Sequence, residues 1–166
     1  MRQQPAQAGF TLLEMLVALV VIAIGLSVAT LAVRPDPRRP LALEAERLAL
    51  LLTQAGEEAE LSGTPMAWVW QADGYAFQRR ELTDRGAEWQ SLDEDELFRA
   101  RRLGEGARID IVRADGSLLP AGARIPLRGE AAADLSLELS LEDARLRIEA
   151  APDGRGYRVA AVAGGG

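Results

Sequence analysis

The sequence contains no cysteine and no histidine, and both absences narrow the chemistry open to it. Without cysteine the protein has no disulfide, no thiolate metal site and no cysteine nucleophile. Without histidine it lacks the commonest general base and the commonest zinc ligand, and a Ser-His-Asp triad is impossible. The sequence also has no Gly-rich phosphate loop. We therefore expect a protein that is not an enzyme and has no cofactor or metal site.

Lysine is absent as well, so all 19 basic residues are arginines, set against 25 acidic residues for a net charge of -6. The arginines are interleaved with Asp and Glu and form no basic run, which argues against nucleic-acid binding. Aromatic residues make up only 5% of a chain that is 48% hydrophobic, so Leu, Ala and Val must fill the core. After its apolar start, the chain of 166 residues has the size of one ordinary domain.

The longest uncharged run extends from Met15 to Val33. As a helix, these nineteen residues would be about 28 Å long, which is close to the thickness of a bilayer core. An alternative is a signal peptide, because Ser27-Val28-Ala29 has the small residues that a conventional signal peptidase needs. That cut would release a soluble exported protein beginning at Thr30. The flanking charges do not orient the segment, since its amino-terminal side carries only Arg2 and the amino terminus.

Glu14 stands near the start of this run, in the stretch GFTLLEMLVALVVIAIGL. An acidic residue at the centre of a spanning helix costs roughly 2.5 to 3.5 kcal/mol, and less near its end, so a compensating charge is expected. Cleavage between Gly9 and Phe10 would supply one, because the new α-amino group of Phe10 would lie one helical turn from Glu14. The pair could close within one chain or between neighbouring chains.

Gly9, Phe10, Thr11, Leu12, Glu14 and the apolar tail together resemble the class III signal of type IV prepilins and type II secretion pseudopilins. The resemblance implies that residues 1–9 are a leader peptide, which a membrane-bound prepilin peptidase removes after Gly9. The same peptidase would then methylate the amino group of Phe10. It also implies that residues 10–33 are a transmembrane and filament-core helix, with the amino terminus on the cytoplasmic side. Glu14 would set the register of filament assembly.

The next segment, 34–40, reads RPDPRRP and predicts a hinge, because proline removes backbone donors and disfavours helix before it. An amphipathic helix is predicted for 41–63, with Pro40 in its first turn and Gly63 at its end. Its apolar stripe could pack on a sheet of the same chain or form a coiled-coil seam, and the Ala and Leu content favours the sheet. The stripe has 4-3-4-3-4 spacing: Leu41, Ala45, Leu48, Leu52, Ala55 and Ala59.

Short strands separated by turns are predicted for a β-rich head over 64–163, followed by a flexible tail, 164–166. Trp68 and Trp70 alternate with smaller residues, and the sequence QADG then turns the chain into the polar strand YAFQRRE. In LSLELSL every second residue is leucine, which predicts a strand with one buried face. Further strands are expected at 89–92, 107–112, 135–141, 146–150 and 156–162, with APDGRG closing the last hairpin.

Four consecutive acidic residues, Asp93 to Glu96, precede a cluster of arginines. They lack the glycine-punctuated spacing of a calcium loop, so we interpret them as a solvated loop or a helix start, with calcium binding left open. The polar loops Asp93–Arg102 and Asp115–Leu119 are the expected interaction surfaces.

The order of these parts resembles the pseudopilin H family of type II secretion systems, whose relatives include the FimT and FimU minor type IV pilins. The resemblance rests on LLTQAGEEAELSGTP, DGYAFQ, WQSLDEDELFRARRLGEG and APDGRGYRV. It implies an α+β, pilin-like fold in which a long N-terminal helix, half transmembrane and half amphipathic, packs on an antiparallel sheet or sandwich head.

The family's role would make the chain a minor pseudopilin in a single-pass precursor of the bacterial inner membrane, with a periplasmic head. Assembled at or near the tip of the pseudopilus, it would help to export folded proteins across the outer membrane. The implied partners are the prepilin peptidase, other major and minor pseudopilins, the inner-membrane secretion platform and, before assembly, the lipid bilayer. A minor type IV pilin that primes pilus growth is the alternative.

Overall fold

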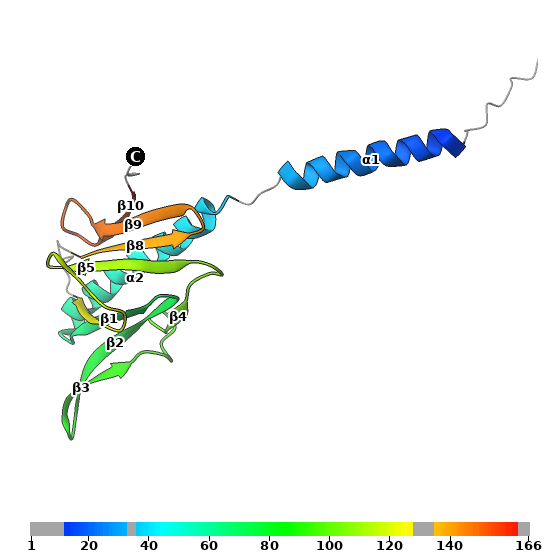
Figure 1. The fold of residues 1–166 in the computed structure, drawn as a ribbon. Coiled ribbons are helices and arrows are strands. Elements are labelled where there is room, and N and C mark those ends of the chain that lie inside the picture. The colour runs from blue at the N-terminus through cyan, green and yellow to red at the C-terminus, as the bar shows by residue number, and fades with distance from the viewer. Residues whose placement is uncertain (1–11, 33–35, 128–134, 163–166) are drawn as a thin grey trace, which may run out of the picture. The chain divides into compact units, whose positions relative to one another are not determined.

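The computed structural model describes residues 12–32, 36–127 and 135–162 (Figure 1). The chain divides into two compact units, residues 1–35 and residues 36–166. The first contains helix α1, Leu12–Ala32. The second, called the head below, contains helix α2, Arg38–Ser62, and two antiparallel sheets. Their strands are β1 Met66–Gln71, β2 Gly74–Thr83, β3 Gly86–Ser91, β4 Arg101–Arg102, β5 Arg108–Ala114, β6 Ser117–Leu118, β7 Arg124–Leu127, β8 Ser136–Leu141, β9 Ala144–Ala150 and β10 Tyr157–Ala161.

Helix α2 begins earlier than the sequence suggested. Pro37 takes the N-cap position, and Arg38 to Pro40 are already helical, so the predicted hinge at 34–40 is wrong for these three residues. Proline is tolerated there because the first turn of a helix has no intrahelical acceptor for its N–H groups. Residues 33–35 of the predicted hinge lie outside the described ranges. The predicted end is confirmed, because Gly63 closes the helix in the left-handed conformation with φ +65°.

The apolar stripe of α2 forms the centre of the head's core. Leu41, Ala45, Leu48, Leu52 and Ala55 are all fully buried, as the spacing predicted. The helix contacts strands of both sheets, β1 and β7 of the first and β8, β9 and β10 of the second. Packing on a sheet, and not a coiled-coil seam, therefore accounts for the stripe. Contact with two sheets also widens the buried face beyond the predicted positions, to include Ala49, Leu51 and Gly56.

The first sheet has the strand order β3-β2-β1-β7, and β4 pairs with the beginning of β2. The predicted hairpin is confirmed, since β1 and β2 pair from Met66–Arg79 to Gln71–Gly74 around the turn at Ala72–Asp73. Alternate residues of these strands project into the core, where their rings contact one another. The ring contacts join Trp68 to Tyr75, Tyr75 to Phe77 and Phe77 to Phe98.

The second sheet has the order β10-β9-β8-β5-β6. Its strands β5, β8, β9 and β10 overlap the predicted strands, and Leu135, Leu137 and Leu139 are buried as the alternation indicated. Strands β4, β6 and β7 were not predicted. A backbone hydrogen bond joins β5 of the second sheet to the turn of the first sheet, from the N–H of Ile109 to the carbonyl of Ala72 at 2.9 Å.

Strand β10 is fixed to α2 by a contact between residues far apart in sequence. The N–H of Tyr157 donates to Oγ1 of Thr53 at 3.0 Å, while the Thr53 hydroxyl donates to the carbonyl of Ala49 at 2.9 Å. Gly156 has φ +79° and lies so close to Thr53 that an added Cβ would stand 2.5 Å from its Cγ2. Only glycine satisfies both the backbone angle and this close approach.

Candidate functional site

Helix α1 has an apolar surface on all of its sides. Its described side chains, up to Ile24, include ten large hydrophobic residues that are about half exposed or more. They occupy nearly every position of three turns, so they cannot be gathered on one stripe as in α2. Such a helix needs apolar surroundings in every direction, in a membrane or among other helices. The ten residues are Leu12, Leu13, Met15, Leu16, Val17, Leu19, Val20, Val21, Ile22 and Ile24.

Glu14 lies in the first turn of α1. A negative charge is favourable near the amino terminus of a helix, so this position suits a carboxylate. Gly9 and Phe10, the predicted cleavage and methylation positions, lie outside the described residues. The structure therefore describes Glu14, and the roles of Gly9 and Phe10 stay predictions. Within the described ranges, no helix meets both the length and the hydropathy required of a membrane span.

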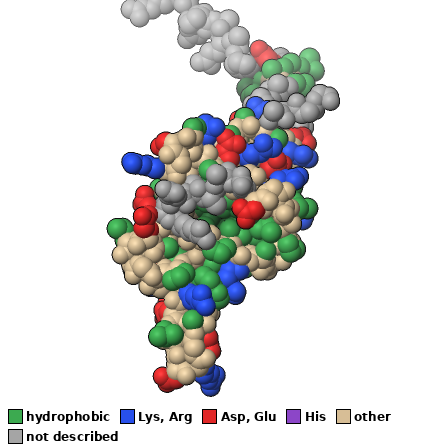
Figure 2. All heavy atoms as spheres, turned by 90° about the vertical axis from the view of Figure 1, so that its left-hand side faces the viewer, with side chains coloured by type: hydrophobic (Ala, Val, Ile, Leu, Met, Phe, Trp, Pro, Cys, Tyr) green, Lys and Arg blue, Asp and Glu red, His purple; other side chains and the backbone are tan. Residues whose placement is uncertain are grey.

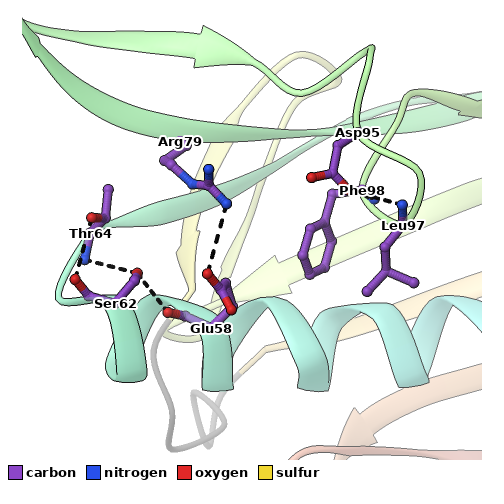
Figure 3. A network of polar contacts seen from close by, with 7 residues as sticks. All are labelled: Glu58, Ser62, Thr64, Arg79, Asp95, Leu97 and Phe98. Atoms are coloured by element: carbon purple, nitrogen blue, oxygen red, sulfur yellow. Dashed lines mark hydrogen bonds and ion pairs between the residues drawn. The ribbon is translucent and has the colours of Figure 1, made fainter.

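The acidic segment Asp93–Glu96 lies in a turn, and one of its carboxylates stabilises the backbone that follows it. Oδ1 of Asp95 accepts hydrogen bonds from the N–H groups of Leu97, at 2.8 Å, and Phe98, at 2.9 Å (Figure 3). These bonds hold Phe98 with its ring directed toward α2, where it is buried 5.4 Å from the ring of Phe77. Among the residues described, no group of three or more acidic side chains is arranged to hold a metal ion.

The two segments expected to be polar loops are partly built into the sheets. Arg101 and Arg102, at the end of the first, form β4, and Nη2 of Arg101 also donates to the carbonyl of Leu97 at 3.2 Å. In the second, Asp115 and Gly116 form the turn between β5 and β6, both at positive φ, and Ser117–Leu118 are β6. Their role as interaction surfaces stays a prediction.

Tyr75 is the ionisable group that the fold perturbs most among the described residues. Burial raises its pKa to about 12, while Arg101 lowers the pKa and Glu44 raises it by smaller amounts. Its hydroxyl is buried without a hydrogen-bond partner in the described part of the chain. The phenol therefore stays neutral at physiological pH and belongs to the core.

The outer face of the first sheet, which points away from the core, is a surface that the sequence analysis missed. At the β2–β3 hairpin, the guanidinium of Arg124 lies 5.1 Å from the centre of the Trp89 ring. Its Nε also donates to Oε1 of Gln78 at 2.7 Å. The single tryptophan in the polar segment EWQS, Trp89, could have indicated this surface from the sequence. Its partner Arg124, however, lies 35 positions further along the chain.

Residues 4–30 match the family model described as the prokaryotic N-terminal methylation motif. No curated protein sequence matches the chain. Two solved structures of the minor pseudopilin EpsH from the type II secretion system of Vibrio cholerae are similar to it. One has 20% identity and a TM-score of 0.60, covering 79% of this chain and 100% of that one. The other has 21% identity and a TM-score of 0.52, covering 76% and 98%.

These similarities confirm two expectations from the sequence. The chain carries a prepilin-type N-terminal methylation motif, and its head has the α+β fold of a minor pseudopilin. The motif lies within residues 4–30, ahead of the head.

Proposed function

We propose that the chain is a minor pseudopilin, a structural subunit of the pseudopilus of a type II secretion system, and that it is not an enzyme. The observation that carries the proposal is the occurrence of a prepilin-type methylation motif and a pseudopilin-like head in one chain. Neither is specific enough alone, since the motif also occurs in type IV pilins and a fold supports many functions. The subunit would lie at or near the tip of the filament and support the export of folded proteins.

The precursor is anchored in the bacterial inner membrane by the helix of residues 10–33, with the head in the periplasm. The exposed apolar side chains of α1 support this part of the proposal, because water is an unfavourable surrounding for them on every side. Prepilin peptidase cuts between Gly9 and Phe10 and methylates the amino group of Phe10. The same apolar surface then packs against the helices of other pseudopilins as the subunit leaves the bilayer for the filament, on the inner-membrane secretion platform.

Glu14 sets the register of this packing. Inside a filament core an unpaired carboxylate is costly, and the methylated amine of a neighbouring Phe10 is the cation available to it. A subunit one step out of place would leave both charges unpaired. The first-turn position of Glu14 supports the pairing, because it keeps the carboxylate at the same end of the helix as the new amino terminus.

The mature amino terminus tests processing. The protein is purified from its native membrane, and its amino-terminal peptide is sequenced by mass spectrometry. The proposal expects a peptide that begins with N-methylated Phe10. A chain that begins at Thr30 would support the soluble exported protein instead, and a chain that retains residues 1–9 would exclude processing at this site.

Substitution of Glu14 tests assembly separately from processing. Glu14→Ala should be cleaved and methylated normally but recovered in sheared filaments at a level lower by about tenfold or more. The substitution leaves the neighbouring Phe10 amine without its carboxylate, and an uncompensated buried charge costs roughly 3 to 5 kcal/mol. Glu46→Ala, which removes an exposed carboxylate from α2, is the matched control and should be incorporated normally. Normal incorporation of Glu14→Ala would exclude the proposed role of this residue.

Deletion of the subunit separates the secretion system from its alternative, a minor type IV pilin. Loss of protein export across the outer membrane, with surface pili retained, is the expected result. Loss of pili with export unchanged would assign the chain to a pilus.

A further inference from the structure

The outer face of the first sheet is basic and apolar on a protein whose net charge is -6. Alternate residues of β2 and β3 point to this face, and cross-strand pairs place Arg80 beside Trp89 and Leu82 beside Ala87. Leu82 is 87% exposed, and Arg80 is also exposed. Figure 2 shows the β2–β3 hairpin projecting from the head, with basic and hydrophobic side chains together where it leaves the body.

Two side chains of this surface, Arg124 and Trp89, are already ordered before any partner binds. Arg124 is held between the Trp89 ring and the Gln78 amide, so neither the guanidinium nor the ring is free to adopt many orientations. A surface whose long side chains are already ordered loses less entropy on binding. Tryptophan and arginine are also the residue types that contribute most often to binding energy at protein interfaces.

The same face continues from Arg124 into a hollow of about 340 Å³. Val69, the cross-strand partner of Arg124, lines it together with Ala76 and Ala100. Arg101 and Arg102 line it as well, and the nearest acidic residue on its wall, Asp73, is 3.9 Å from Arg102. The hollow can therefore take one apolar side chain, with Arg101 and Arg102 on its wall and Arg124 opposite Val69 on the neighbouring strand.

The opposite face of the hairpin carries two acidic residues next to Arg79, which already pairs with Glu58. Glu81 and Glu88 are direct cross-strand partners there, and both are exposed. Like charges in that arrangement are unfavourable, and they repel an acidic partner. These two glutamates therefore make the opposite face less favourable than the outer face for an acidic segment.

From this placement we propose that the outer face, defined by Arg80, Leu82, Trp89, Arg124 and the hollow beside Val69, is a docking surface for a protein segment that carries carboxylates on both sides of an apolar side chain. The apolar side chain fills the hollow and contacts Leu82, and the carboxylates pair with Arg80, Arg124 and Arg101. The inference rests on the proposed function in one respect, that the segment belongs to another subunit of the same assembly.

Photo-cross-linking in cells tests the surface with the full-length protein. Ala87, which is exposed beside Leu82, is replaced by benzoylphenylalanine, and the cross-linked peptide is identified by mass spectrometry. The expected product is a peptide of another filament subunit with acidic residues flanking an apolar one. A lipid adduct, or a peptide without acidic residues, would overturn the proposal. The same probe at Arg145, an exposed position of β9, is the control for random capture.

Two surface substitutions test the chemistry of the contact. Arg80→Glu and Leu82→Ser should each lower the yield of that cross-link about fivefold or more, since both side chains are exposed and neither substitution removes a core contact. Arg145→Glu makes the same charge change elsewhere and should leave the yield unchanged, and thermal unfolding of each variant checks the fold. Unchanged yields for Arg80→Glu and Leu82→Ser would refute the docking surface.

Failure of this inference and failure of the proposed function give different results. If the docking surface is wrong, Arg80→Glu enters filaments and cross-links normally while Glu14→Ala does not enter them. If the filament role is wrong, methylated Phe10 is absent, and a charge-dependent cross-link from Ala87 would then identify a partner outside a filament.

Discussion

Gly156→Ala should destabilise the head strongly, although it adds only one methyl group. Two costs combine at this position. Alanine is unfavourable at φ +79°, by roughly 1 to 2 kcal/mol. Its Cβ would also lie 2.5 Å from Cγ2 and 2.6 Å from Oγ1 of Thr53, so the helix side chain or strand β10 has to move.

That movement adds a second penalty of roughly 1 to 3 kcal/mol, as for overpacking of a core, and it weakens the bond from the Tyr157 N–H to Thr53. We expect a total loss of about 3 kcal/mol in the free energy of unfolding. Gly154→Ala in the same turn is a matched control, because Gly154 has φ +71° but no heavy atom within 4 Å of an added Cβ. It should lose only the backbone contribution, about 1 to 2 kcal/mol.

Urea unfolding of the full-length chain in mild detergent, followed by tryptophan fluorescence, measures both variants. Thr53→Ala supplies a double-mutant cycle, since it removes the two nearest atoms and should cost less in the Gly156→Ala background than in the native one, by about 1 kcal/mol. Equal losses for Gly154→Ala and Gly156→Ala, with no coupling to Thr53, would refute the argument that the helix and β10 are locked at this point.

Two further substitutions test the core and the acidic turn. Tyr75→Phe should leave stability at pH 7 unchanged or raise it by up to about 1 kcal/mol, because the buried hydroxyl has no partner in the described part of the chain. The pKa of Tyr75 is about 12 in the folded state and 10.0 in its absence, so between these pH values the unfolded state loses its proton first. Relative to the Phe variant, the free energy of unfolding of the wild-type protein should therefore fall by about 2 to 3 kcal/mol as pH rises from 10 to 12. Urea midpoints at pH 9 and 11.5 measure this difference. Asp95→Ala should cost about 1 to 2 kcal/mol in the same assay, because two N–H groups lose their acceptor, whereas Asp93→Ala should change the midpoint little.

Local periodicity accounts for what could be predicted of the fold. The stripe of α2, the β1–β2 hairpin with its turn at Ala72–Asp73 and the alternating leucines of β8 are each visible within one continuous segment of sequence. A helix or hairpin depends mostly on neighbours a few residues away, so its pattern is present in the sequence itself. The left-handed end of α2 at Gly63 was predictable for the same reason.

The elements that were missed depend on distant partners. Strand β7 contains Pro126, which removes a backbone donor and argues against a strand, yet it pairs with β1 at one edge of the first sheet, where a proline is tolerated. Strands β4 and β6 have two residues each, too few to show alternation. The stacking of Arg124 on Trp89 likewise depends on four strands lying in the order β3-β2-β1-β7, which no local pattern contains.

The candidate site divides in the same way. The methylation motif could be predicted because glycine, phenylalanine and glutamate stand at fixed offsets in one segment. Asp95 was visible only as one of four consecutive acidic residues, and nothing local distinguished the carboxylate that binds two N–H groups from its neighbours. In the proposed filament the partner of Glu14 belongs to a neighbouring subunit, so a single chain does not show that pair.

The two helices have different relations to their surroundings, and this difference bears on how the protein can work. Helix α2 buries one face against two sheets and exposes charged residues elsewhere, so the head completes its own core. Helix α1 exposes apolar side chains on every side, so it has no polar face that could be left to water. Burial of apolar surface contributes about 25 cal/mol per Å², so any process that covers this surface is favoured. This contribution does not distinguish one neighbouring helix from another. Specificity must then come from Glu14 and from the surface of the head. We therefore propose that Glu14 sets the register of assembly and that the surface of the head selects the partner subunit.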